Sequence, residues 1–141
     1  MKNSAEIKFD SLSVNERFAR IAVSAFASAL DPTVEELSDI KTAVSEAVTN
    51  SIVHGYRNSK GEVKMKMYID GNVLRIEIVD YGAGIENVKK AMEPFFTTCG
   101  DGTRSGMGFT VMESFMDEVS VVSAPEEGTR VVMYKKIGEK K

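Results

Sequence analysis

In this 141-residue chain a carboxylate, an amide and an imidazole follow one another at intervals of four residues: Glu46, Asn50 and His54. On an α-helix a step of four residues turns the side-chain direction by only about 40°, so these three side chains share one narrow band. An amide oxygen is a ligand suited to Mg²⁺, and a carboxylate one turn away can orient a hydroxyl or a water. By itself the pattern favours the solvated polar flank of an amphipathic helix, and a carboxylate and an amide pointing into a cleft is the functional alternative.

A second polar signal is Asp80-x-Gly82-x-Gly84, which directly follows an apolar run ending at Val79. An aspartate at a strand end can accept a hydrogen bond from an exocyclic amine, and two glycines let a planar ring approach the backbone closely. The pattern is short, so an ordinary Asp/Gly turn is the alternative.

A third signal is the glycine-rich junction of residues 104–109, which contains Gly106-x-Gly108. Backbone N–H groups and the positive end of a helix attract anions at such a junction. The pattern is neither a phosphate loop of the G-x-x-x-x-G-K-[ST] type nor a dinucleotide fingerprint, which must follow a strand. A flexible loop with a glycine N-cap is the alternative.

Two amphipathic helices must position the first of these groups, and each begins with a capping box: Ser13 with Glu16, and Thr33 with Glu36. Asp31-Pro32 separates them. The predicted core face of the first helix comprises Phe18, Ile21, Ala22, Ala25, Phe26 and Ala29. The predicted core stripe of the second comprises Leu37, Ile40, Val44, Ala47, Val48 and Ile52, and the helix ends near Gly55.

From residue 62 onward the apolar period changes to two, which predicts a hairpin of residues 63–69 and 74–78 around Asp70-Gly71. A first strand near Ile7 and Phe9, a short helix at about 85–92, a helix from Phe109 and two strands near 119–123 and 129–135 complete the pattern. This order is not the alternation of a parallel Rossmann sheet. It predicts an α+β fold, a two-layer sandwich with a mixed, largely antiparallel sheet and helices on one face, in one domain over residues 1–141.

Composition narrows the classes of function. Eighteen Lys and Arg against 21 Asp and Glu give a net charge of −3, so we expect no nucleic-acid partner. Cys99 is the only cysteine and His54 the only histidine, which excludes an internal disulfide and a cysteine-based zinc cluster. The longest mostly apolar stretch, residues 21–30, is about half a membrane span, and the N-terminus lacks the apolar core of a signal peptide. We expect a cytoplasmic protein without a membrane partner.

Taken in order, the three signals and Gly128-Thr129 before the last strand resemble the Bergerat ATP-binding fold, the GHKL family of gyrase, Hsp90, histidine kinases and MutL. The resemblance runs from Glu46 to Thr129. Residues 46–56, 94–98, 104–113 and 115–119 further resemble the bacterial anti-sigma serine kinases.

The resemblance implies ATP or ADP with Mg²⁺ as cofactors. Asp80 would accept the adenine amino group, with Thr129 supporting the base and Asn50 holding Mg²⁺. Glu46 would be the catalytic base and Arg104 would neutralise charge on the γ-phosphoryl group. His54 would be a packed residue of the nucleotide site rather than a phosphoacceptor. The remaining nucleotide-binding residues, several of them in an ATP lid at about 94–108, would be Gly82, Gly84, Thr97, Thr98, Ser105, Gly106, Met107, Gly108 and Phe109.

The implied function is that of an anti-sigma factor and protein serine kinase. With ATP bound it would hold a sporulation sigma factor, and it would phosphorylate a serine of an anti-anti-sigma factor to inactivate that antagonist. A homodimer through the first helix and strand is expected, and Glu16 and Arg20 would meet protein partners. The alternatives are a general-stress kinase of the same family, a nucleotide-dependent binding module without phosphotransfer, and an ATPase fragment of the gyrase or MutL kind.

Overall fold

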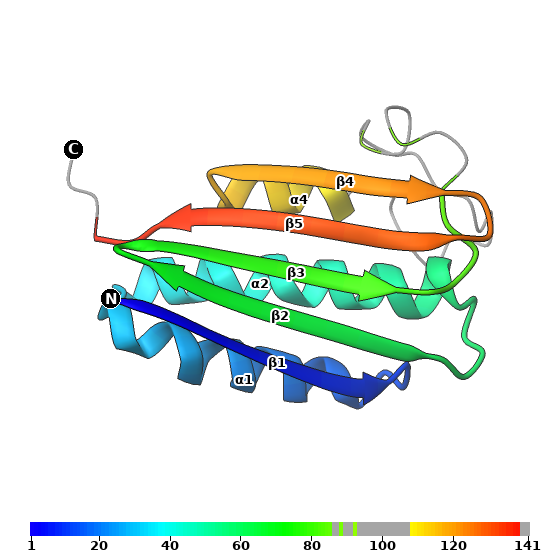
Figure 1. Cartoon of the computed structure of the whole chain (residues 1–141), viewed down its shortest axis with the longest axis horizontal. Helices are drawn as coiled ribbons and strands as arrows, with labels where there is room; N and C mark the ends of the chain where they lie inside the picture. Colours follow the sequence, from blue (N-terminus) through cyan, green and yellow to red (C-terminus); the bar gives the residue numbers. More distant parts are fainter. Residues whose placement is uncertain (86–87, 89–91, 93–107, 139–141) are drawn as a thin grey trace.

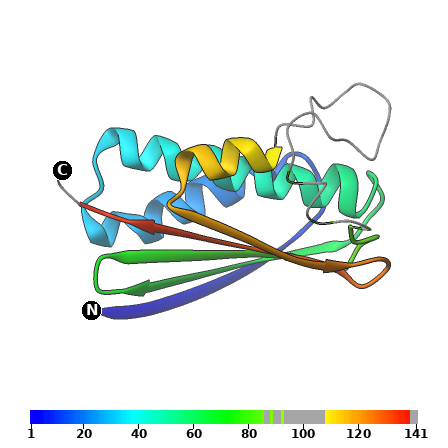
Figure 2. The same cartoon turned by 90° about the horizontal axis from the view of Figure 1, so that it is seen from above.

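The structure is a computed structural model that describes residues 1–85, 88, 92 and 108–138. Five strands form one sheet in the order β1-β2-β3-β5-β4, and helices cover one of its faces, so the molecule has two layers (Figures 1 and 2). The strands are β1 (Lys2–Asp10), β2 (Glu62–Asp70), β3 (Val73–Asp80), β4 (Glu118–Ala124) and β5 (Gly128–Lys136). All four pairings are antiparallel, so the described part of the sheet, expected to be mixed, contains no parallel pair.

Strands β2 and β3 form the predicted hairpin. Val63, Met65, Met67 and Ile69 of β2 are buried against the helices, and the residues between them face the other side of the sheet. The two strands are joined by Gly71 and Asn72, and Gly71 has a φ of 64°. A glycine at the first central position suits a two-residue hairpin turn.

Helix α1 (Asn15–Ala27) corrects the prediction of its core face. It buries Ala19, Val23 and Ala27, whereas Phe18 and Ile21 are 47% and 58% exposed. Small residues at every fourth position let α1 lie close to α2, whereas Phe18, whose ring makes an edge contact with Phe9, and Ile21 lie outside this contact. Of the face predicted to be buried, Ala25 and Ala29 are also exposed, and only Ala22 and Phe26 pack against the core.

The predicted capping box of α1 is also wrong. The helix N-cap is Val14, which makes no side-chain cap, and the carboxylate of Glu16 accepts a hydrogen bond from the Thr49 hydroxyl at 2.9 Å. Glu16 thus bonds to the neighbouring helix instead of its own first turn. The contact between α1 and α2 therefore takes the place of the capping box that the sequence predicts.

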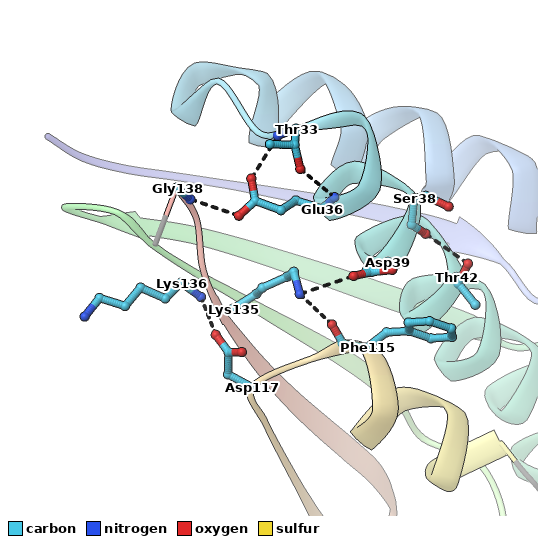
Figure 3. A network of polar contacts seen from close by, with 10 residues as sticks. All are labelled: Thr33, Glu36, Ser38, Asp39, Thr42, Phe115, Asp117, Lys135, Lys136 and Gly138. Carbon is cyan, nitrogen blue, oxygen red and sulfur yellow. Dashed lines mark hydrogen bonds and ion pairs between the residues drawn. The ribbon is translucent and has the colours of Figure 1, made fainter. Parts of the chain in front are cut away.

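Helix α2 (Val34–Asn50) begins with the predicted capping box, drawn in Figure 3. The Glu36 N–H donates to the Thr33 hydroxyl at 3.0 Å, and the Thr33 N–H donates to the Glu36 carboxylate at 2.8 Å. The second carboxylate oxygen accepts from the Gly138 N–H, and these backbone donors hold the pKa of Glu36 below its usual value. Buried residues of α2 are Ile40, Ala43, Val44, Ala47 and Val48, while Leu37 is only half-buried.

Helix α4 (Gly108–Phe115) packs against α2 and is held at its C-terminal end by the last strand. The Lys135 ammonium donates to the Phe115 carbonyl at 2.7 Å and lies 3.6 Å from the Asp39 carboxylate of α2 (Figure 3). A cation is favourable at the negative end of a helix. Lys135 therefore ties α4, α2 and β5 together.

Two predicted segments fall largely outside the described residues: the short helix at about 85–92 and the ATP lid at about 94–108. In the first, the Met92 N–H donates to the Val88 carbonyl at 3.1 Å. In the part of the chain that the structure describes, no helix is long and apolar enough to cross a membrane.

Candidate nucleotide-binding site

The end of α2 and the start of α4 meet at Asn50. A Cβ atom added to Gly108 would lie 2.9 Å from the Asn50 side-chain nitrogen, so the first residue of α4 lies directly against the Asn50 amide. Glu46 lies one turn earlier on α2 and is half-buried, and Phe109 is buried behind the junction. The fold thus brings a carboxylate, an amide and a helix N-terminus to one place.

Asp80 ends β3 and is the most deeply buried acidic residue of the candidate site, with 3% of its surface exposed. Its carboxylate accepts from the Gly82 N–H at 3.0 Å and from the Ser51 hydroxyl. Burial raises the pKa of Asp80, and the hydrogen bonds from Gly82, Ser51 and the Thr129 backbone oppose this shift. A buried carboxylate with neutral donors on one side is suited to accept a further hydrogen bond from a ligand amine.

The glycines after Asp80 are also needed for packing within the protein. A Cβ atom on Gly82 would lie 2.2 Å from the Gly55 carbonyl oxygen, and one on Gly84 would lie 1.9 Å from the Ala124 carbonyl oxygen. Gly84 also has a φ of 75°. Both glycines are therefore required where the turn packs against other backbone segments, before any ligand is considered.

A π-helix, η2 (Ser51–Gly55), follows α2 directly and changes the direction of the side chains. The Tyr56 N–H donates to the Ser51 carbonyl five residues earlier, at 2.8 Å. His54 lies in this wider turn, so the prediction of one α-helical band through Glu46, Asn50 and His54 holds only for the first two. The wider turn places the Ser51 hydroxyl and the Gly55 backbone against Asp80.

Thr129 lies opposite Asp80 in the β3–β5 ladder. Its hydroxyl is 2.8 Å from the hydroxyl of Ser123, which also accepts from the Ile85 N–H at 2.8 Å. The structure thus brings Thr129 beside Asp80, as the proposed adenine role requires. Sequence reasoning missed Ser51 and Ser123, because a single serine without a motif carries no signal of its own.

Glu16 and Arg20, the candidate partner-binding residues, lie on α1, and Glu16 is joined to α2 through Thr49. The Nε atom of Arg20 is buried and has no hydrogen-bond partner within the described residues. Thr97, Thr98, Arg104, Ser105, Gly106 and Met107 lie outside the described residues, as does Cys99.

The residues present fit a magnesium ion held together with a nucleotide. Among the described residues, no group of three or more His, Cys, Asp or Glu side chains is placed to hold a metal. Mg²⁺ commonly takes one or two protein ligands and completes its shell with phosphates and water. A single amide oxygen from Asn50, beside the N-terminus of α4, suits that arrangement, because the first N–H groups of a helix have no acceptor within the helix.

Comparison with known proteins places this geometry in a family. Residues 11–135 match the histidine kinase-like ATPase domain family. The chain is 57% identical over 139 residues to the anti-sigma F factor of Thermoanaerobacter sp. (strain X514), covering 99% of this chain and 97% of that protein. It is 55% identical over 136 residues to the anti-sigma F factor of Clostridium acetobutylicum, covering 96% and 95% of the two chains.

A solved structure with a similar fold contains the RsbU and RsbW domains of Rv1364c from Mycobacterium tuberculosis. The TM-score is 0.71 at 18% identity, over 98% of this chain and 33% of that chain. At this identity the likeness concerns the fold alone.

Proposed function

Since the chain belongs to the histidine kinase-like ATPase family and, within it, to the anti-sigma F factors, we propose that it is an ATP-dependent protein serine kinase. Its substrate in this proposal is a serine of an anti-anti-sigma factor, and its ATP-bound form holds a sporulation sigma factor. One domain over residues 1–141, acting in the cytoplasm with Mg²⁺, performs both tasks. The observation that carries the proposal is the buried Asp80 carboxylate, with its neutral donors, at the end of β3.

Recognition of adenine falls to the Asp80 carboxylate. Gly82 and Ser51 donate to it from the protein, and the exocyclic amine of adenine supplies a further donor. Thr129 supports the same end of the base from β5, with its hydroxyl oriented by Ser123. A site built to pair a buried acceptor discriminates strongly against a base that lacks the matching donor.

The phosphates are held at the junction of α2 and α4. Asn50 would supply an oxygen ligand to Mg²⁺, and the bound ion would neutralise phosphate charge. The first N–H groups of α4, at Gly108 and Phe109, have no acceptor within the helix and face the anion. Thr97, Thr98, Ser105, Gly106 and Met107 complete the phosphate site in this proposal, and Arg104 neutralises charge on the γ-phosphoryl group.

Glu46 positions the attacking hydroxyl. In the transfer step the serine oxygen forms a bond to the γ-phosphorus, the bond from that phosphorus to the bridging oxygen breaks, and ADP leaves. The serine proton passes to the Glu46 carboxylate. The transition state of phosphoryl transfer is loose, so orienting the nucleophile matters more than the basicity of the carboxylate.

The two protein partners are proposed to meet α1 near Glu16 and Arg20. The hydrogen bond from Thr49 to Glu16 joins this surface to the residue next to Asn50, so partner and nucleotide sites share one connection.

A homodimer through α1 is also proposed. Val14, Phe18, Ile21 and Ala25 follow one another at helical spacing and are all exposed, and we call them the α1 stripe. A contiguous apolar stripe on the surface of a small domain is typical of an interface. A two-fold axis would bring the stripes of two copies together, because such an interface uses the same patch twice.

Transfer of label from γ-labelled ATP to a candidate anti-anti-sigma factor tests the proposed function. Label on a serine of that partner supports the kinase. Nucleotide binding without transfer would identify a binding module, and release of phosphate without labelled partner would identify an ATPase. Either of these two results contradicts the proposal.

A further inference from the structure

Tyr56, in the loop that follows the π-helix, has no part in the proposed mechanism yet contacts the turn that carries Asp80. Its hydroxyl accepts a hydrogen bond from the Tyr81 N–H at 2.8 Å and donates one to the Glu62 carbonyl. Its ring lies over Gly61, where an added Cβ atom would come within 2.3 Å of a ring carbon. The absence of a side chain at Gly61 thus leaves room for the ring, and the hydroxyl contacts the residue that directly follows β3.

The contact with Tyr81 is one of several hydrogen bonds that hold the turn. The Ala83 N–H donates to the Gly55 carbonyl at 2.7 Å, on the other side of Gly82. Gly82 itself packs directly against Gly55. Gly55 and Tyr56 therefore accept hydrogen bonds from the residues on both sides of Gly82, which itself donates to Asp80.

Asp80 is fully buried and its position depends on this turn. Its backbone is continuous with Tyr81, so a shift of the Tyr81 amide moves the carboxylate that is proposed to read the base. Selectivity for a base needs the acceptor within hydrogen-bond geometry of one exocyclic group, and small displacements weaken such a contact steeply.

We propose that the Tyr56 hydroxyl is a positioning group that sets the base selectivity of the nucleotide site, by fixing the turn that carries Asp80. This rests on the proposed function, because it assumes that Asp80 reads the exocyclic amine of adenine. Burial raises the pKa of Tyr56, so the hydroxyl keeps its proton and both hydrogen bonds at neutral pH.

The test compares ADP with IDP, whose base carries an oxo group in place of the amine. Tyr56→Phe keeps the ring over Gly61 and removes only the hydroxyl. We expect it to weaken ADP binding by about threefold to tenfold and to leave IDP binding nearly unchanged, so that the selectivity ratio falls by a similar factor. The KM for ATP should rise in proportion, with kcat for serine phosphorylation unchanged.

Tyr68→Phe is the matched control. Tyr68 lies on β2, and its ring stacks with the Arg75 guanidinium at 4.0 Å from the ring centroid. This variant also loses a tyrosine hydroxyl, but not one that touches the Asp80 turn, so its ADP-to-IDP ratio should equal that of the wild type. Gly61→Ala is a second test, because the added methyl group displaces the Tyr56 ring and should reduce the ratio as well.

An unchanged ratio in both Tyr56→Phe and Gly61→Ala overturns the proposal for Tyr56. That failure differs from a failure of the proposed function, in which the wild-type protein itself would bind ADP and IDP equally. A wild type that prefers ADP, with a reduced preference in Tyr56→Phe and an unaltered one in Tyr68→Phe, supports the positioning role.

Discussion

The Asp80 carboxylate is a deeply buried hydrogen-bond acceptor, and one substitution tests whether it binds adenine. Asp80→Asn should abolish measurable ADP binding, because the amide nitrogen would face N–H or O–H donors where the carboxylate now accepts. A buried hydrogen bond left unmade costs about 1–3 kcal/mol, and more when one partner is charged. Isothermal titration with ADP measures the effect, with Asp70→Asn at the exposed end of β2 as the control. Wild-type affinity in Asp80→Asn would remove this residue from the adenine site.

The same variant tests the electrostatics of the folded protein. Because burial raises the pKa of Asp80, the folded state binds this proton more tightly than the unfolded chain does. The ordinary pKa of this carboxyl group is 3.8. As the pH rises from 3.8 through the raised pKa of the folded state, ionisation of Asp80 lowers the free energy of unfolding, and above that folded-state pKa the loss is complete. Unfolding in urea should show the wild type gaining stability relative to Asp80→Asn as the pH is lowered toward 4.

Glu46 is assigned to the nucleophile and not to the nucleotide, which predicts a split between binding and chemistry. Glu46→Gln should keep ATP affinity within severalfold of the wild type and lose most serine phosphorylation. Asn50→Ala provides the contrast, because it should weaken Mg²⁺-dependent binding as well. Single-turnover transfer with saturating ATP measures the chemical step, and a wild-type rate in Glu46→Gln would show that the assignment as base is wrong.

Among the elements, α4 is held at its two ends by different chemistry. Its first residue packs against Asn50, and its last carbonyl accepts from Lys135, which also lies beside Asp39 (Figure 3). An eight-residue helix is too short to be stable alone, so its position depends on these contacts. The end that is proposed to face the phosphates is thus positioned by a lysine at the opposite end.

Lys135→Met should lower the free energy of unfolding by about 1–3 kcal/mol, because it leaves the Phe115 carbonyl and the Asp39 carboxylate without their cation. Adding Asp39→Asn to Lys135→Met should recover part of this loss, since the double variant leaves no partly buried charge. Urea denaturation of the two single variants and the double variant measures the coupling. Purely additive effects would mean that the two side chains do not interact.

For the whole molecule, the α1 stripe is an apolar surface that the other described residues leave exposed. Ile21→Glu should convert the proposed dimer into a monomer and leave the melting temperature of the monomer nearly unchanged, because Ile21 is 58% exposed. Val34→Glu is the matched control, since Val34 is 88% exposed and begins α2 rather than lying on the stripe. Sedimentation equilibrium gives the masses. A wild type that is monomeric, or an Ile21→Glu variant that remains dimeric, contradicts the proposed interface.

The sequence by itself determined the elements whose signals are local. The capping box of Thr33 and Glu36 formed as predicted because both partners lie within one turn of the same helix. The β2–β3 hairpin formed because alternation and a glycine turn specify register without reference to distant residues. The motif that begins at Asp80 marked the buried carboxylate for the same reason.

Only the tertiary structure decided which side of α1 is buried and how α2 ends. Helix α1 carries two apolar stripes, and periodicity does not tell whether close helix packing selects Ala19, Val23 and Ala27 or the bulkier Phe18 and Ile21. The π-helix at residues 51–55 also has no local pattern, and it places Ser51 and Gly55 against Asp80 across the fold. Contacts between residues far apart in the chain select among the states that local preferences allow, and a single sequence read along its length does not contain them.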